Sequence, residues 1–219
     1  MSRYTAARTS LRTAAIMVVF TLIFTSLMSL TYRMTRPAIE ASELAERMRL
    51  INEVLPPERY DNALLEDYVT IGPAPELGLS RDSRVYRARL EDAPSALILE
   101  AVAPDGYGGR IELAVAVSLD GRISGVRVTA HSETPGLGDY IDPRKDRERD
   151  NPWILQFDEV SFAQVPAERW RVRRDGGAFD YRIGATISAS AVTRATGRAL
   201  EYAIRHRDAL FDAETGERL

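Results

Sequence analysis

The chain has 219 residues, of which 45% are hydrophobic and 28% charged, and its formal net charge is -3. These values fit one globular domain with an appendage, and no stripe of Lys and Arg interleaved with aromatic residues points to nucleic acid as a partner. The chain contains no cysteine, which excludes disulfides, thiol chemistry and iron–sulfur clusters bound by this chain.

An apolar segment near the N-terminus predicts a membrane anchor. Residues 13–32 carry no charge, and at roughly 1.5 Å per residue a helix of this length spans about 30 Å, the hydrocarbon thickness of a bilayer. We therefore predict a transmembrane helix at 13–32. The flanking Arg residues narrowly favour a cytoplasmic N-terminus at 1–12. A cleaved signal peptide is the alternative, although the apolar run is long for one and no A-x-A cleavage site follows.

A charged helix with one apolar stripe follows the span and predicts a stalk at 33–57, with Pro37 in its first turn and Pro56-Pro57 at its end. The stripe consists of Leu44, Met48, Ile51 and Leu55. The rest of the chain, 58–219, is predicted to be a periplasmic domain. Its first part, 60–81, contains several Gly and Pro residues and is expected to be irregular or a mixture of short elements.

Alternating apolar residues predict an antiparallel sheet in this domain. Two strands are expected at 84–90 and 96–102, and a hairpin turns at Asp120-Gly121 between alternating segments at 111–119 and 126–130. The predicted fold class is α+β, an antiparallel sheet with helices packed on one side, preceded by one N-terminal transmembrane helix. Two further strands are expected, at 170–173 and 179–183.

The stretch Gly184-Ala185-Thr186 lies between the last of these strands and a helix expected from about Ser188. A strand that turns through glycine into a helix leaves the first helical amides unpaired, with the positive end of the helix dipole behind them, and this arrangement suits a phosphate. The Thr186 hydroxyl could contact that phosphate or be esterified to it. The alternative is a plain strand exit in which Ser or Thr caps the helix. The apolar face expected for the helix consists of Val192, Ala195, Ala199, Ala203 and Leu210.

A second candidate site is the loop 131–139, where glycine and proline give a defined shape in which backbone amides can approach a flat ligand. His131, Glu133 and Asp139 are metal-ligand types, but their spacing matches no known metal pattern, so loop packing and solvation are the simpler interpretation. We expect 144–150 to be a solvated charged run and 152–157 an apolar segment that covers the sheet or lines a pocket.

Five motifs carry a family resemblance. They are Ala103-Pro-Asp-Gly-Tyr-Gly-Gly109, the Asp120-Gly121 hairpin, His131-Ser-Glu-Thr-Pro-Gly-Leu-Gly138, Trp153-Ile154 with Phe157, and Asp180-Tyr-Arg-Ile-Gly-Ala-Thr186. In order and spacing they resemble RnfG, the G component of the Rnf (also called Rsx) electron transport complex, over nearly the whole chain. A related family is NqrC, the C component of the sodium-translocating NADH:quinone reductase, which shares the flavin domain. The histidine-led loop and modest length favour the Rnf component.

The resemblance implies covalent FMN, held by a phosphoester bond to Thr186. Electron transfer needs no acid–base pair or nucleophile, and we expect no catalytic or metal-binding residue in the chain. Asp180 would help a separate flavin transferase recognise the site, and Trp153 is a weaker candidate for contact with the ring. Ile183 stands where the family usually has Ser or Thr, which removes a hydroxyl beside the site. The expected cofactor-binding residues are Thr186, Gly184, Ala185, Thr134, Gly136, Leu137 and Gly138.

The resemblance also implies a flavoprotein component of a translocase that relays electrons and couples their transfer, between ferredoxin and NAD, to ion translocation. Its partners would be the other membrane and iron–sulfur subunits and the flavin transferase. The chain would be single-pass in a bacterial inner membrane with its domain in the periplasm. The alternatives are a component of a sodium-translocating NADH:quinone reductase, and a non-catalytic membrane-anchored FMN-binding or sensory module.

Overall fold

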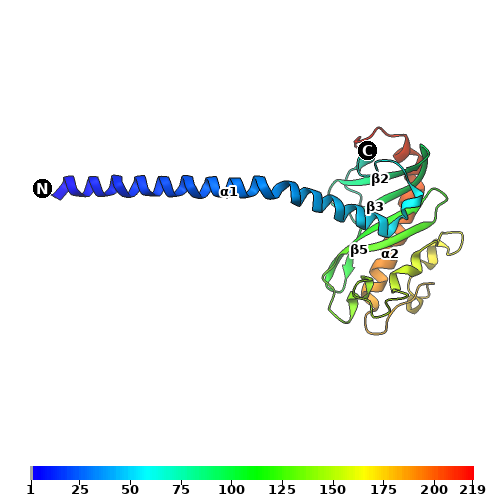
Figure 1. Cartoon of the computed structure of the whole chain (residues 1–219). Helices are drawn as coiled ribbons and strands as arrows, with labels where there is room; N and C mark the ends of the chain where they lie inside the picture. The colour runs from blue at the N-terminus through cyan, green and yellow to red at the C-terminus, as the bar shows by residue number, and fades with distance from the viewer. Residues whose placement is uncertain (1) are drawn as a thin grey trace. The chain divides into compact units, whose positions relative to one another are not determined.

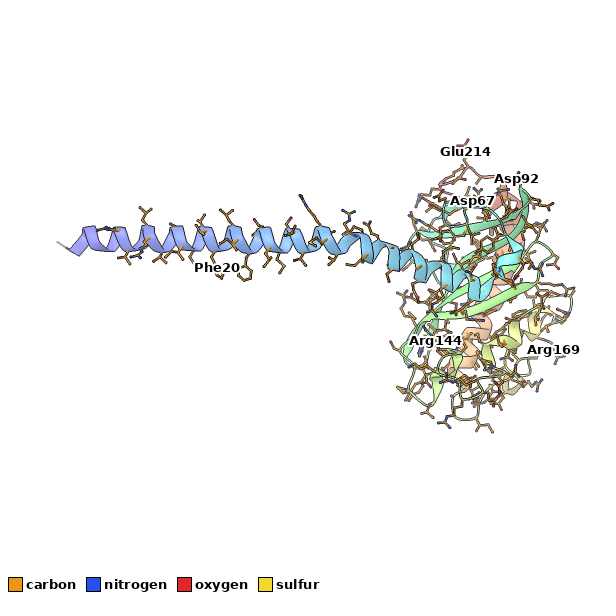
Figure 2. The ribbon with its side chains drawn as sticks, in the orientation of Figure 1. Phe20, Asp67, Asp92, Arg144, Arg169 and Glu214 are labelled. Carbon is orange, nitrogen blue, oxygen red and sulfur yellow. The ribbon has the colours of Figure 1, made fainter. Side chains whose placement is uncertain are left out.

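The computed structural model describes residues 2–219, which divide into one unit that ends at Arg47 and a second that runs from Met48 to Leu219. The first helix, α1 (Ser2–Val54), includes the predicted span, and Pro37 lies inside it rather than at the start of a separate helix. The apolar side chains of the span, including Phe20 in Figure 2, are exposed. Among the described residues, this is the one helix long and apolar enough to cross a membrane.

Five strands form one antiparallel sheet in which each strand pairs with the next along the chain. They are β1 (Tyr68–Ile71), β2 (Ser83–Leu90), β3 (Ala93–Gly106), β4 (Gly109–Ser118) and β5 (Ile123–Ala130). The two strands and the hairpin predicted from alternation are confirmed, and so is the α+β class. The segment 60–81 holds β1 and a short 3-10 helix, η2 (Pro75–Leu77), after η1 (Pro57–Arg59).

One face of the sheet packs against the second long helix, α2 (Thr186–Asp212), as Figure 1 shows. The apolar face predicted for this helix is confirmed, since all five of its residues are buried. Successive strand residues point to opposite faces, so every second residue of the central strands faces this core. The sheet contributes Leu97, Leu99, Leu113, Val115, Val117, Val126 and Val128.

The opposite face of the sheet is also covered, which differs from the expectation of helices on one side only. Small and apolar residues on that face, Ala88, Ile98 and Ala116, pack with Ile51 and Val54 from the end of α1. The approach is close, because a Cβ on Gly125 of β5 would lie 2.6 Å from the Val54 carbonyl oxygen. Alternate residues along β2 to β4 point to opposite faces of the sheet, and both sets include apolar residues. Neither face of the sheet is therefore exposed to water.

Between β5 and α2 the chain forms four 3-10 helices rather than strands. They are η3 (Gly138–Ile141), η4 (Trp153–Phe157), η5 (Ala167–Arg169) and η6 (Arg173–Asp175). The strands predicted at 170–173 and 179–183 are therefore wrong, and only an isolated bridge joins Val172 to Phe179. Their apolar residues serve a different purpose, because Trp170 and Phe179 join Trp153 and Phe157 in a buried aromatic cluster.

Arg87 of β2 is a buried cation, 2% exposed, that ties the sheet to the C-terminal end of α2. Its guanidinium donates to the carbonyl oxygen of Ala213 at 2.6 Å and to the hydroxyl of Thr215 at 2.8 Å, and it pairs with Asp67, labelled in Figure 2. A cationic side chain at the negative end of a helix satisfies carbonyls that the helix leaves free. Arg87 thus fixes the C-terminal end of α2, and Thr186 lies at the other end of the same helix.

Candidate functional site

The start of α2 lacks a side-chain cap. The helix begins at Thr186, and the residue before it, Ala185, makes no capping hydrogen bond with its side chain. The Ser188 hydroxyl does not cap the helix either, since it donates to the Glu133 carboxylate. The capping alternative for this stretch is therefore wrong. The hydroxyl of Thr186 has no hydrogen-bond partner among residues 2–219, although the residue is only 9% exposed.

Two buried side chains, those of Tyr140 and Asp146, fix the segment that leads into α2. The Tyr140 hydroxyl donates to the Ala185 carbonyl oxygen at 3.2 Å and accepts from the Arg182 backbone N–H at 3.2 Å. Burial raises the pKa of the Tyr140 phenol, which keeps this donor protonated. The Arg182 guanidinium lies over the Tyr140 ring, 4.9 Å from its centroid, and pairs with Asp146. Gly184, at φ 88, makes the turn between these anchors.

Asp146 corrects the expectation of a solvated charged run at 144–150. Its side chain is buried and accepts from the backbone N–H of Trp153 at 2.8 Å, from the backbone N–H of Glu148 at 3.0 Å, and from the Arg182 guanidinium. The other members of the run that carry exposed charges are Arg144, Lys145, Arg147, Glu148, Arg149 and Asp150. One carboxylate of the run thus anchors the segment before Thr186.

A cavity of ≈ 150 Å³ opens at Thr186 and brings the two candidate stretches together. From the predicted site it is lined by Gly184, Ala185, Thr186, Thr134, Leu137 and Gly138. Residues about 50 positions apart in the sequence therefore share one wall. The cavity is also lined by four residues that sequence reasoning did not assign to the cofactor, namely Tyr107, Glu133, Ile187 and Ser188.

Three predicted residues lie outside the cavity wall. Gly136, at φ 75, shapes the loop, and its N–H donates to Asp139 Oδ1 at 2.8 Å. Asp180 pairs with Arg173 at 2.7 Å on the surface. The indole N–H of Trp153 donates to the Asp180 carbonyl oxygen at 2.7 Å. Trp153 thus supports the segment that leads into α2 rather than lining the cavity.

The residues that sequence reasoning missed carried partial signals. Tyr107 stands between glycines, a pattern that was taken only as a loop of unusual backbone angles. Glu133 was considered with His131 and Asp139 as a weak metal site, yet no cluster of metal-ligating residues occurs in the described part of the chain. The expected solvation of these charges is wrong for Glu133, which is 4% exposed.

The chemistry of this wall fits a phosphate ester joined to a flat apolar group. Helical amides without a side-chain cap and a free hydroxyl lie at one end. At the mouth, Tyr107, Leu137 and Ile187 are exposed by 68%, 56% and 50%. The cavity is smaller than the about 300–1,000 Å³ of usual ligand pockets. It could enclose part of a flavin nucleotide, with the ring against the apolar side chains at the mouth.

Two family models match the chain. An FMN-binding domain matches residues 106–201, a range that contains Tyr107, the 131–139 loop and Thr186. An RnfG N-terminal region matches residues 1–54, the range that ends with α1.

The chain is also similar along most of its length to curated bacterial proteins named as the G component of an ion-translocating oxidoreductase complex. The protein of Pseudomonas aeruginosa (strain UCBPP-PA14) is 41% identical over 207 residues, which cover 94% of each chain. That of Vibrio atlanticus is 38% identical over 196 residues, 90% of this chain and 91% of its own. That of Shewanella loihica is 39% identical over 195 residues, 89% of this chain and 90% of its own.

Proposed function

Since the chain belongs to the RnfG family, the G components of ion-translocating oxidoreductase complexes, we propose that it carries FMN covalently on Thr186 and relays electrons between other subunits of such a complex. The family confirms the resemblance seen in the sequence motifs. The chain is an FMN-binding subunit of an ion-translocating oxidoreductase complex. The site of attachment, its chemistry and the partners are the parts that we propose.

The observation that carries the attachment is the convergence of the 131–139 loop and the start of α2 on one cavity at Thr186. A phosphoester there would keep one negative charge, which the free amides and the dipole of α2 stabilise. When bound, FMN supplies the redox chemistry, and the chain orients it and tunes its potential. Gly184, Ala185 and Thr134 would surround the phosphate and ribityl end, and Leu137 and Gly138 the ring.

Asp180 is proposed as a contact of the flavin transferase, because its side chain is exposed and stands outside the cavity. Ile183 is 95% exposed and also outside the cavity wall. The missing hydroxyl at this position would therefore concern the transferase rather than the bound flavin. The other proposed partners are the membrane and iron–sulfur subunits between which the flavin passes electrons, in this family from ferredoxin to NAD or the reverse.

We further propose that 13–32 spans a bacterial inner membrane once, with 1–12 in the cytoplasm, a stalk at 33–57 and the flavin domain 58–219 in the periplasm. The apolar N-terminal helix supports the span. A reporter pair fused after Leu219 tests the orientation. Alkaline phosphatase should be active there and green fluorescent protein dark, and the reverse result would refute it.

The attachment is tested by intact mass and in-gel fluorescence of the denatured full-length chain, coexpressed with a flavin transferase. The wild-type chain should gain the mass of one FMN less water, and Thr186→Val should gain none while it remains folded. Thr196→Val is the matched control, because it removes a buried threonine hydroxyl from the same helix outside the cavity wall and should leave attachment intact. Fluorescence retained by Thr186→Val would overturn the assignment.

A further inference from the structure

Glu133 is a buried carboxylate that accepts hydrogen bonds from the β3–β4 turn and from the first turn of α2. Its side chain is 4% exposed. Oε1 accepts from the backbone N–H of Gly108 at 3.1 Å, and Oε2 accepts from the hydroxyl of Ser188. Within residues 2–219 no Lys or Arg forms an ion pair with it. A buried negative charge without a cation is unfavourable for folding unless hydrogen bonds compensate it.

The same carboxylate lies close to two glycines, one in β3 and one in the 131–139 loop. A Cβ on Gly106 would lie 2.7 Å from Glu133 Oε1, and a Cβ on Gly138 would lie 2.7 Å from Glu133 Oε2. Real Cβ atoms do not come this close to an oxygen, and a second oxygen obstructs each position as well, the Gly109 carbonyl at 2.4 Å from Gly106 and the Ser188 hydroxyl at 2.6 Å from Gly138. The carboxylate therefore joins three segments, namely the β3–β4 turn, the 131–139 loop and the start of α2.

These three segments are the walls of the cavity at Thr186. Tyr107 comes from the turn between β3 and β4, Leu137 from the loop, and Thr186 from the helix start, and Glu133 itself lines the cavity. A neutral glutamine could fill the same space, so shape alone does not account for a charge at this position. The charge acts on whatever occupies the cavity, because the Glu133 side chain is buried and a buried charge is weakly screened.

We propose that Glu133 is a positioning residue for the flavin, which holds the three cavity walls together and whose negative charge lowers the flavin's reduction potential. The inference rests on the proposed attachment of FMN to Thr186. Reduction adds electrons to the ring, and a fixed negative charge in the wall of the same cavity opposes that step. A residue that served folding alone would change stability without moving the potential or the visible spectrum.

The test uses the full-length, flavin-loaded chain and the variant Glu133→Gln, which removes the charge and keeps the side-chain length. Asp158→Asn is the matched control, because it neutralises a partly buried carboxylate that does not line the cavity. Flavin content by intact mass, the flavin absorption spectrum and the midpoint potential are measured for each. We expect full flavin content in the control and at least a tenfold higher reduced-to-oxidised ratio for Glu133→Gln at a fixed potential, about 30 mV for a two-electron couple.

The outcomes separate this inference from the proposed function. A wild-type chain without covalent flavin refutes the proposed function. A loaded Glu133→Gln chain with the potential and spectrum of Asp158→Asn refutes the role of Glu133 alone. A folded Glu133→Gln chain that the transferase no longer loads supports it, provided that the control is loaded.

If Glu133→Gln does not fold, Gly138→Ala replaces it. Gly138 is absent from the glycines with positive φ, so alanine is strained there only by the contacts of its Cβ with Glu133 and Ser188. It should displace the carboxylate and shift the flavin spectrum and potential. Gly138→Ala with wild-type spectrum and potential would overturn the proposal.

Discussion

The segment before Thr186 should depend on one buried carboxylate, and Asp146→Ala tests this. The substitution removes three hydrogen bonds, which come from the backbone N–H of Trp153, the backbone N–H of Glu148 and the Arg182 guanidinium. Trp153 is 7% exposed, so its N–H has little access to water. Arg182 is 28% exposed in its side chain and can be hydrated in part.

The magnitude follows from these exposures. A buried N–H left without an acceptor costs about 1–3 kcal/mol, and the loss of a charge-assisted bond from a partly hydrated Arg182 adds about 1 kcal/mol. The exposed N–H of Glu148 finds water and adds little. The expected loss in the free energy of unfolding is about 3 kcal/mol, which lowers Tm by about 6–12 °C for a domain of this size.

Urea and thermal unfolding followed by tryptophan fluorescence measure this loss. The chain has only two Trp residues, Trp153 and Trp170, and both are buried in the domain, so the signal excludes α1. Asp180→Ala is the control, because it breaks an exposed ion pair of the same segment and should change stability by less than about 1 kcal/mol. If Asp146→Ala were as stable as this control, the anchoring role of Asp146 would be refuted.

Three further changes have defined outcomes. Burial raises the pKa of Asp158 from 3.8 to about 6, so the folded chain binds this proton more tightly than the unfolded chain, and the free energy of unfolding falls as the pH rises between these values. In urea unfolding at pH 5 and pH 8, Asp158→Asn should remove that fall. Above pH 6 the variant should have a free energy of unfolding about 1–2 kcal/mol higher than the wild type, after allowance for screening by solvent. Arg87→Met should lower the free energy of unfolding by about 3–5 kcal/mol, because it leaves Asp67 and the Ala213 carbonyl without their buried donor; an unchanged urea midpoint would contradict this. Gly184→Ala should cost about 1–2 kcal/mol for its φ of 88, and since no atom obstructs the new Cβ, intact mass should still show flavin attachment; a loss of attachment in a folded chain would oppose the assignment of the turn.

Local pattern predicted the elements whose burial repeats along the chain. Alternation located β2 to β5 within a few residues, and the spacing of Val192, Ala195 and Ala199 identified the buried face of α2. The same method failed at Trp170 and Phe179, because isolated apolar residues of an aromatic cluster resemble those of short strands. Sequence periodicity identifies the buried face of a regular helix or strand, and these two residues lie in neither.

The candidate site was predictable only as two separate stretches. Glycine and Thr186 indicated one, and the Thr134 to Gly138 loop the other, but no sequence spacing states that they meet in one cavity. Glu133 and Asp146 were treated as solvated charges because most carboxylates are. Their burial follows from partners that are distant in sequence, such as Ser188 and Arg182, so only the fold reveals it.

Under the proposed attachment of FMN to Thr186, the segment 180–186 must both be accessible to a separate enzyme and keep its folded shape. The side chains of Asp180 and Ile183 face solvent, where a transferase can contact them. On the inner side, Asp146 pairs with Arg182, and the Tyr140 hydroxyl donates to the Ala185 carbonyl oxygen. Because the anchors and the exposed residues are different residues, the proposed transferase would be able to contact the segment without unfolding the cavity wall. This separation explains why a single polar change at Asp146 should affect stability far more than one at Asp180.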